Sequence, residues 1–134
     1  MEAPIRKIKI IGIEKEGIED SDNFPGVYYK LPFKLSEEPD YRWQRLFENN
    51  YRTYGHSKKR NAHILNDTIV VDITKADNMQ THADIIKKIV EQTNNEVDKE
   101  DERIIASIER AKEMKKDELE TIEKLKEKTD IIKF

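Results

Sequence analysis

The chain has 134 residues, a single-domain length, and contains no cysteine, which excludes disulfides, thiolate metal sites and cysteine nucleophiles. Charged residues make up 40% of the sequence against roughly 25% in an average globular protein, so many side chains must lie on solvated faces. The formal net charge of −3 excludes the strong basic excess by which many nucleic-acid-binding domains are recognised.

The sequence contains no segment with the pattern of a membrane anchor or an export signal. Its apolar runs are short, whereas a helix that spans a bilayer needs roughly 20 apolar residues. The N-terminal residues lead into alternating isoleucine and lysine instead of the continuous apolar stretch of a signal peptide. We therefore expect a cytoplasmic protein with no membrane partner.

Two strands are predicted in the first part of the chain. Ile8 and Ile10 alternate with lysines, and the isoleucines on either side of Gly12 indicate burial on both faces or a bulge. A clearer alternation of apolar and polar residues runs from Val27 to Leu35. Pro32 has no backbone N–H to donate, so we expect this strand at an edge of the sheet or turned outward at the proline.

A helix and a hairpin are predicted next. Ser36 is the expected N-cap of the helix, and Trp43, Leu46 and Phe47 follow at helical spacing, so they would pack on the sheet. Two strands then surround Asn66-Asp67, residues that tolerate a positive φ. A two-residue turn places Ile64 opposite Ile69, Ala62 opposite Val71 and His63 opposite Val70.

The sequence after the hairpin predicts a further helix. Thr74–Asp77 and Thr81–Asp84 both resemble capping boxes, and an apolar stripe includes Ile86 and Ile89. Together these elements predict an α+β fold with a small, mostly antiparallel sheet in the order β-β-α-β-β-α within a domain of residues 1–95. Thr93-Asn94-Asn95 is a weak break, which leaves open whether residues 76–128 form one helix or a helical hairpin.

The predicted C-terminal extension, residues 96–134, is a charged helix with a narrow apolar stripe, interrupted by lysines, that is typical of a coiled-coil seam. Such a seam needs a covering partner, which is either the preceding helix, a second copy of the chain or another helical protein. We favour a symmetric homodimer because the preceding helix already packs on the sheet. The predicted interface residues are Ile104, Ile108, Ala111, Leu119, Ile122 and Leu125.

The most suggestive segment for ligand binding is residues 51–63, which combines cations, histidines and tyrosines around Gly55. Cations interleaved with aromatic rings can hold phosphates and stack on bases, so the segment is a candidate site for a nucleotide, another phosphate-bearing ligand or nucleic acid. A solvated loop that protects a strand edge is the competing interpretation. The candidate binding residues are Arg52, Tyr54, His56, Lys58, Lys59 and Arg60.

No metal-ligand spacing, phosphate-binding glycine loop or nucleophile motif is present, so no metal or cofactor is predicted. Asp72, Asp77 and His82 could form an acid/base group, although helix capping explains Asp77 equally well. The leading hypothesis is a non-enzymatic binding or regulatory module that oligomerises or docks a partner through its C-terminal helix. The alternatives are a binder of phosphate-bearing ligands and an enzyme with a pocket beside His56 and Trp43.

Overall fold

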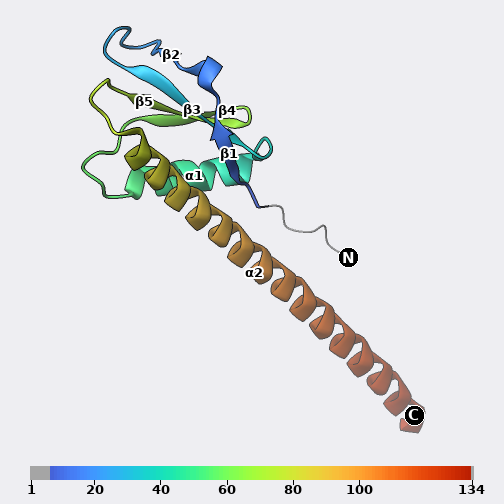
Figure 1. Ribbon diagram of the computed structural model, residues 1–134. Helices are drawn as coiled ribbons and strands as arrows, with labels where there is room; N and C mark the ends of the chain where they lie inside the picture. Colours follow the sequence, from blue (N-terminus) through green and yellow to red (C-terminus); the bar gives the residue numbers. More distant parts are fainter. Residues whose placement is uncertain (1–6, 134) are drawn as a thin grey trace. The chain divides into compact units, whose positions relative to one another are not determined.

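The computed structural model describes residues 7–133 and has an α+β fold (Figure 1). The predicted fold class and its antiparallel sheet are confirmed, and a short strand and a 3-10 turn are added in the acidic loop that follows the first strand. The predicted absence of an export signal concerns residues 1–6 and lies outside the described range. The elements are β1 (Ile10–Ile13), η1 (Lys15–Gly17), β2 (Glu19–Asp20), β3 (Tyr29–Leu35), α1 (Tyr41–Thr53), β4 (Ala62–Leu65), β5 (Thr68–Ile73), α2 (Met79–Lys128) and η2 (Thr129–Ile131).

The sheet has the order β1-β3-β5-β4, and β2 also pairs with β3, so β3 is an internal strand. Of the two alternatives expected for Pro32, an edge strand is therefore wrong, and the proline is instead turned to a side where its missing N–H is not required. Because Leu35 donates its N–H to Asp67 in the β5 direction, alternation turns the nitrogen of Pro32 to the opposite side of β3. There β1 and β2 are interrupted by η1, so the proline lies where no donor is needed.

The sequence left two interpretations for the isoleucines around Gly12, and the structure selects one of them. The register of β1 against β3 shifts between Ile10 and Gly12, which is a β-bulge. Ile11 is 64% exposed, so burial on both faces is excluded. The bulge points this side chain outward while Ile10 still packs against the core.

The hairpin formed by β4 and β5 has the predicted register. Ile64 lies opposite Ile69, Ala62 opposite Val71 and His63 opposite Val70. Asn66 adopts a φ of 56°, as a two-residue hairpin turn requires.

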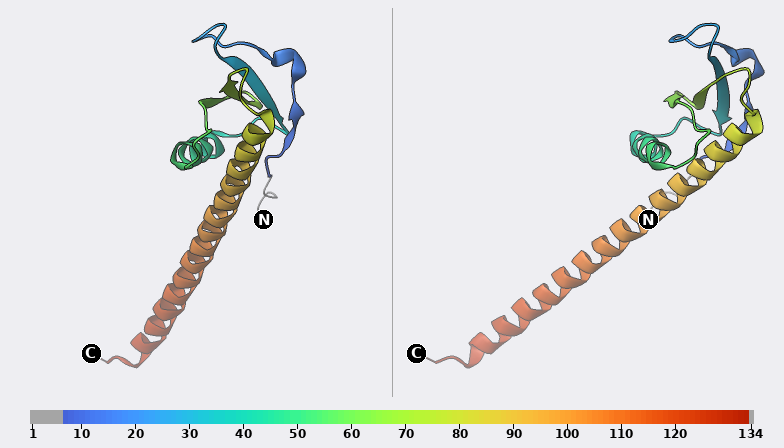
Figure 2. Two further views of the ribbon diagram at one scale, coloured as in Figure 1. Left: turned by 60° about the vertical axis from the view of Figure 1, so that its left-hand side comes forward. Right: turned by 90° about the vertical axis from the view of Figure 1, so that its left-hand side faces the viewer.

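The core lies between one face of the sheet and two helices, α1 and the first turns of α2. In Figure 2 α1 is seen nearly end-on whereas α2 is seen along its length, so the two helices cross instead of running parallel. Trp43 and Phe47 stack on each other with ring centroids 5.4 Å apart, and Phe47 stacks on Tyr51 in turn. The largest fully buried side chains are Phe33, Phe47, Leu31, Leu35, Ile69, Ile86, Ile89, Val71 and Thr93. This packing fixes the end of α1, from which the candidate ligand-binding segment begins.

The N-cap of α1 is Asp40, whose side chain accepts a hydrogen bond of 2.8 Å from the backbone N–H of Trp43. The expected N-cap, Ser36, lies before the helix and uses its hydroxyl to accept a hydrogen bond from the Lys9 N–H. The acidic run after Ser36 resembled a helix start, but the backbone N–H of Ser36 donates to the Lys9 carbonyl and continues the pairing with the N-terminal segment.

Residues 79–128 form one continuous helix, so the alternative of a helical hairpin is excluded. Thr93 and Asn94, which suggested a break, are instead part of the helix face that packs on the rest of the domain. Asn94 joins both backbone groups of Ile8 and the indole N–H of Trp43, and Thr93 accepts a hydrogen bond from Asn50.

The described chain divides into two compact units, of which the first ends at Val97 and the second begins at Asp98. The last residue of the first unit, Val97, is buried in the core, whereas the side chains of the second unit are largely exposed. No helix in residues 7–133 is both long enough and apolar enough to cross a membrane.

Candidate functional site

The candidate segment, residues 51–63, leaves the last turn of α1 and returns to the sheet at β4. Its six predicted binding residues do not form one cluster. Lys59 and Arg60 hold parts of the fold together. Tyr54 and His56 stack on each other. Arg52 and Lys58 are exposed cations.

Lys59 closes the C-terminal end of α1. Its ammonium group donates hydrogen bonds to the carbonyl oxygens of Tyr51, Arg52 and Tyr54 at 2.6, 3.1 and 3.0 Å. The nitrogen also lies 5.2 Å from the centroid of the Tyr51 ring. A cation at this position satisfies carbonyls that have no partner within the helix and opposes the negative end of the helix dipole.

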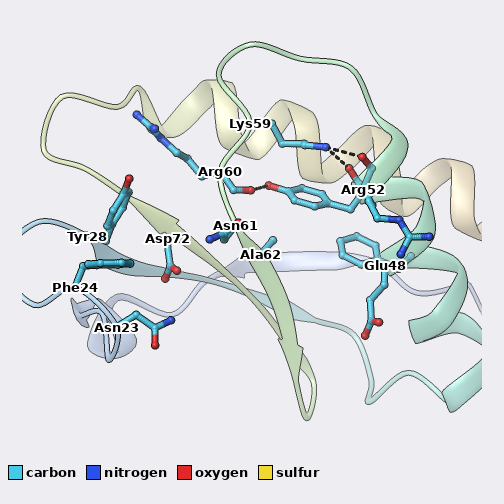
Figure 3. A pocket seen from close by; sticks show the side chains of 12 residues that line it. Asn23, Phe24, Tyr28, Glu48, Arg52, Lys59, Arg60, Asn61, Ala62 and Asp72 are labelled. Carbon is cyan, nitrogen blue, oxygen red and sulfur yellow. Dashed lines mark hydrogen bonds between the residues drawn. The ribbon is translucent and has the colours of Figure 1, made fainter.

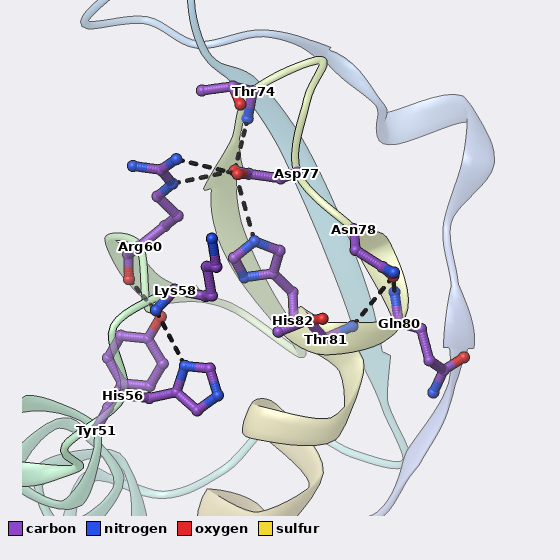
Figure 4. Close-up of polar contacts among 10 residues, drawn as sticks. All are labelled: Tyr51, His56, Lys58, Arg60, Thr74, Asp77, Asn78, Gln80, Thr81 and His82. Atoms are coloured by element: carbon purple, nitrogen blue, oxygen red, sulfur yellow. Dashed lines mark hydrogen bonds and ion pairs between the residues drawn. The ribbon is translucent and has the colours of Figure 1, made fainter.

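Arg60 forms a bidentate ion pair with Asp77, which lies two residues before the start of α2 (Figure 4). Both guanidinium contacts measure 3.0 Å, and one carboxylate oxygen also accepts a hydrogen bond of 2.9 Å from the Thr74 N–H. The hydrogen bond from Arg60 and the amide of Thr74 hold the pKa of Asp77 far below its usual range. Asp77 is therefore ionised and fully engaged.

His82 completes this polar cluster from the first turns of α2. Its Nε2 lies 3.5 Å from the Asp77 carboxylate, and the side chain is buried. Burial lowers the pKa of His82, although Asp77 opposes that effect. The cap of α2 is Asn78, whose side chain accepts from the N–H groups of Gln80 and Thr81. Neither predicted capping box starts the helix, because Thr74 lies before it and Thr81 lies inside it.

The Tyr51 hydroxyl ties the candidate segment to α1 by donating to the carbonyl oxygen of Arg60. Burial raises the pKa of Tyr51 to about 12, so this phenol stays protonated and remains a donor. Farther out, Tyr54 and His56 stack with nearly parallel rings, and Nδ1 of His56 accepts the N–H of Lys58.

A cavity of about 500 Å³ lies beside the segment, in the first unit (Figure 3). Arg52, Lys59 and Arg60 line it, whereas Tyr54, His56 and Lys58 do not. Phe24 and Tyr28, which meet edge to face, lie on one side of it, and Glu48 and Arg52 lie on the other. The cavity thus combines aromatic surface, cations and carboxylates.

Several residues that line this cavity carried no signal in the sequence. They are Asn23, Phe24 and Tyr28, which belong to the loop between β2 and β3. Asp72 of β5, which the sequence offered as a possible acid/base partner of Asp77 and His82, lines the cavity as well. They reach the cavity only because β3 pairs with β5 in the centre of the sheet. His56 and Trp43, proposed as neighbours in an enzyme pocket, are not combined here: neither lines the cavity, and the Trp43 indole is bound to Asn94 in the core.

The second unit carries the predicted interface residues on α2. Ile104, Ile108, Leu119, Ile122 and Leu125 are 42–56% exposed, and Ala111 is exposed as well. Around them the helix consists mainly of Glu and Lys. Large aliphatic side chains on an otherwise charged helix form the second candidate site, a surface for a helical partner.

Within residues 7–133, no group of three or more His, Cys, Asp or Glu side chains is placed to hold a metal ion. Comparison of the chain with protein-family models, with curated proteins and with solved structures found no match.

Proposed function

We propose that this protein is a non-enzymatic binding or regulatory module that assembles with a second copy of itself through residues 98–128 of α2. The supporting observation is the exposed aliphatic stripe of the second unit. Its five large side chains each keep about half of their surface in water. At roughly 1.5–3 kcal/mol for a fully buried Ile or Leu, covering them would contribute on the order of 1 kcal/mol each.

The stripe needs a partner from outside the chain. The helical hairpin that would have covered it is excluded, because α2 is continuous. Within the first unit the apolar face of α2, including Ile86 and Ile89, is already buried in the core. A second copy presents an identical stripe and is available whenever the protein is made.

The test is the mass of the full chain at tens of micromolar, measured by light scattering coupled to size exclusion. We expect a dimer, and we expect Ile108→Glu combined with Leu119→Glu and Ile122→Glu to give a folded monomer. The matched control, Ala106→Glu with Lys124→Glu, makes the same change in charge on the opposite side of the helix and should remain dimeric. A monomeric unmodified chain would refute self-assembly.

A second candidate function, binding of a phosphate-bearing ligand such as a nucleotide, is supported by the cavity of the first unit. Arg52, Lys59 and Arg60 line it together with the rings of Phe24 and Tyr28. Lys59 and Arg60 already have structural partners, whereas Arg52 is exposed and its guanidinium donates to the side chain of Asn49 at 2.7 Å, so Arg52 is the cation that a ligand would meet first. Arg52 lies on the wall opposite Phe24 and Tyr28, whereas the Arg60 guanidinium lies 6.0 Å from the centroid of the Tyr28 ring. Cations and aromatic rings around one cavity suit a ligand with an anionic group and a flat ring.

Calorimetric titration with ATP at low and at high salt tests this second function. We expect binding that weakens steeply as salt rises and that is reduced by Arg52→Gln. Arg45→Gln is the matched control, because Arg45 is an exposed cation of the same helix that does not line the cavity. Absence of any heat of binding at low salt would refute this second function. A titration with inorganic phosphate in place of ATP shows whether the adenine ring contributes to binding.

A further inference from the structure

The charged residues within the stripe of the second unit carry information about how two copies pair. The positions Ile104, Ile108, Ala111, Lys115, Glu118, Ile122 and Leu125 follow one another at alternating intervals of four and three residues. This is the uninterrupted spacing of a coiled-coil seam. Lys115 and Glu118 are therefore members of the seam, and Leu119 flanks it.

We infer that the two copies pair antiparallel, with Lys115 of each helix opposite Glu118 of the partner copy. The inference rests on the proposed self-assembly and adds its orientation and register. A parallel pair and an antiparallel pair would bring different residues of the seam together, and only the antiparallel pair matches opposite charges.

A parallel pair brings every seam residue against its own copy. Lys115 would meet Lys115, and in the next layer Glu118 would meet Glu118, so two adjacent layers would hold like charges. Like charges opposite each other in a partly buried seam are destabilising, because the contact loses water without gaining an attraction. The parallel arrangement thus penalises the centre of the seam.

In an antiparallel pair the two helices run in opposite directions, so residue numbers rise along one helix while they fall along the other. A seam residue then faces a different residue of the partner instead of its own copy. With Lys115 opposite Glu118, Ile108 lies opposite Leu125 and Ala111 lies opposite Ile122. The central layers then hold two ion pairs of opposite charge, and the flanking layers hold aliphatic side chains only.

Sliding the antiparallel pair by one heptad destroys this match. A shift in one direction places Glu118 opposite Ile108, and a shift in the other direction places it opposite Ile122. Both leave a carboxylate against an aliphatic side chain without a cation. The polar centre thus selects one register at a cost in stability, as single polar positions do in other coiled coils.

The seam in this register extends from Ile108 to Leu125, which corresponds to an overlap of roughly 27 Å at 1.5 Å per residue. Ile104 lies beyond it, opposite the end of the partner's α2. The overlap is centred between Lys115 and Glu118. Val97, the last residue of the first unit, lies about 20 residues from that centre along the helix, or roughly 29 Å. The two copies of Val97 would be far apart, whereas a parallel pair would place them next to each other.

Disulfide formation in the full chain tests the orientation directly, because the sequence contains no cysteine of its own. Two variants, Ile108→Cys and Leu125→Cys, are oxidised separately and as a mixture, and the linked species are identified by mass spectrometry. We expect little linkage in either variant alone and linkage between the two in the mixture, since only opposed residues approach closely enough for a disulfide.

The outcomes separate this inference from the proposed function. Efficient linkage within each single variant indicates a parallel pair, and a dimer that links in none of these combinations has another register; both results overturn the inference and leave self-assembly intact. A monomeric unmodified chain overturns both proposals. Circular dichroism of each variant shows whether the helix is retained.

Charge exchange gives an independent measurement. Lys115→Glu alone, or Glu118→Lys alone, places like charges opposite each other in the antiparallel register, and we expect the dimer dissociation constant to rise roughly tenfold. The double variant restores opposite charges and should return to within about threefold of the unmodified chain. Failure of the double variant to recover, with both single variants weakened, contradicts the register.

Discussion

At the scale of single residues, the cluster of Asp77, Arg60 and His82 couples protonation to stability. Burial lowers the pKa of His82 from its ordinary value of 6.5, so the folded protein holds this imidazole neutral. An unfolded chain binds a proton at that site near pH 6.5, before the folded chain does. Between the two pKa values the unfolded state binds more protons, and stability must fall as the pH falls.

We therefore expect the free energy of unfolding to decrease as the pH falls from 7.5 to 5, and the decrease to be smaller in His82→Gln. Chemical denaturation at several pH values measures this slope. His63→Gln is the control, because His63 is exposed on β4 and should leave the slope unchanged. Equal slopes for His82→Gln and the unmodified chain would show that His82 does not couple protonation to folding.

The two adjacent lysines of the candidate segment have different structural roles. Lys59 donates three hydrogen bonds from its ammonium group to carbonyls at the end of α1. Lys58 is exposed, and its backbone N–H donates to Nδ1 of His56. We expect Lys59→Gln to lower the free energy of unfolding by roughly 1–2 kcal/mol, because charged hydrogen bonds are lost. Lys58→Gln should change it by less than about 0.5 kcal/mol, and equal effects in urea titrations would contradict the capping role.

The role of Arg60 could not be predicted from its neighbours. Its partner Asp77 lies 17 residues away, beyond the whole hairpin, and the two meet only after β4 and β5 have paired. The sequence identified a cationic segment correctly but could not show that half of its lysines and arginines were engaged by the fold. Phe24 and Tyr28 reach the cavity through the same kind of long-range pairing.

At the scale of elements, features that depend on neighbouring residues could be predicted from the sequence, whereas features that depend on the pairing of distant segments could not. The turn at Asn66 and the period of two fixed the β4–β5 register, because both signals lie within the hairpin. The position of β3 depends instead on which strands pair with its two sides. Pro32 left two alternatives open from the sequence, and only the pairing of β3, with the interruption at η1, excludes the edge strand. Asn94 misled for a similar reason, since its partners are Ile8 and Trp43.

Asn94 offers a test of how α2 is attached to the domain. Asn94→Ala removes the acceptor of the Trp43 indole and both hydrogen bonds to Ile8, so we expect a loss of roughly 1–3 kcal/mol in stability. Asn95→Ala is the control, since Asn95 is exposed and the change brings the same gain in helix propensity. Fluorescence of Trp43, the single tryptophan, reports the altered environment during denaturation, and equal stabilities of the two variants would contradict the attachment.

At the scale of the whole molecule, the two units differ in what holds them. The first unit has its own core of sheet, α1 and α2 residues up to Val97. Past that point the side chains of the helix are largely exposed, and in our proposal the second copy covers its aliphatic stripe. The boundary between the two units, Val97/Asp98, lies two residues from the boundary predicted between residues 1–95 and 96–134. In our proposal the first unit folds on its own and the second joins two copies.

A shortened chain that ends at Val97 should therefore fold alone and be monomeric. Circular dichroism, a cooperative thermal transition and light scattering measure the two properties, and we expect the transition to lie within a few degrees of the dissociated full chain because no core residue is lost. A chain that ends at Val90 is the matched comparison. It lacks Thr93, Asn94 and Val97, which hold Asn50, Ile8 and the edge of the core, so it should melt well below the longer fragment. If the chain ending at Val97 is unfolded, the second unit stabilises the first, and the division into an independent domain and a joining helix is wrong.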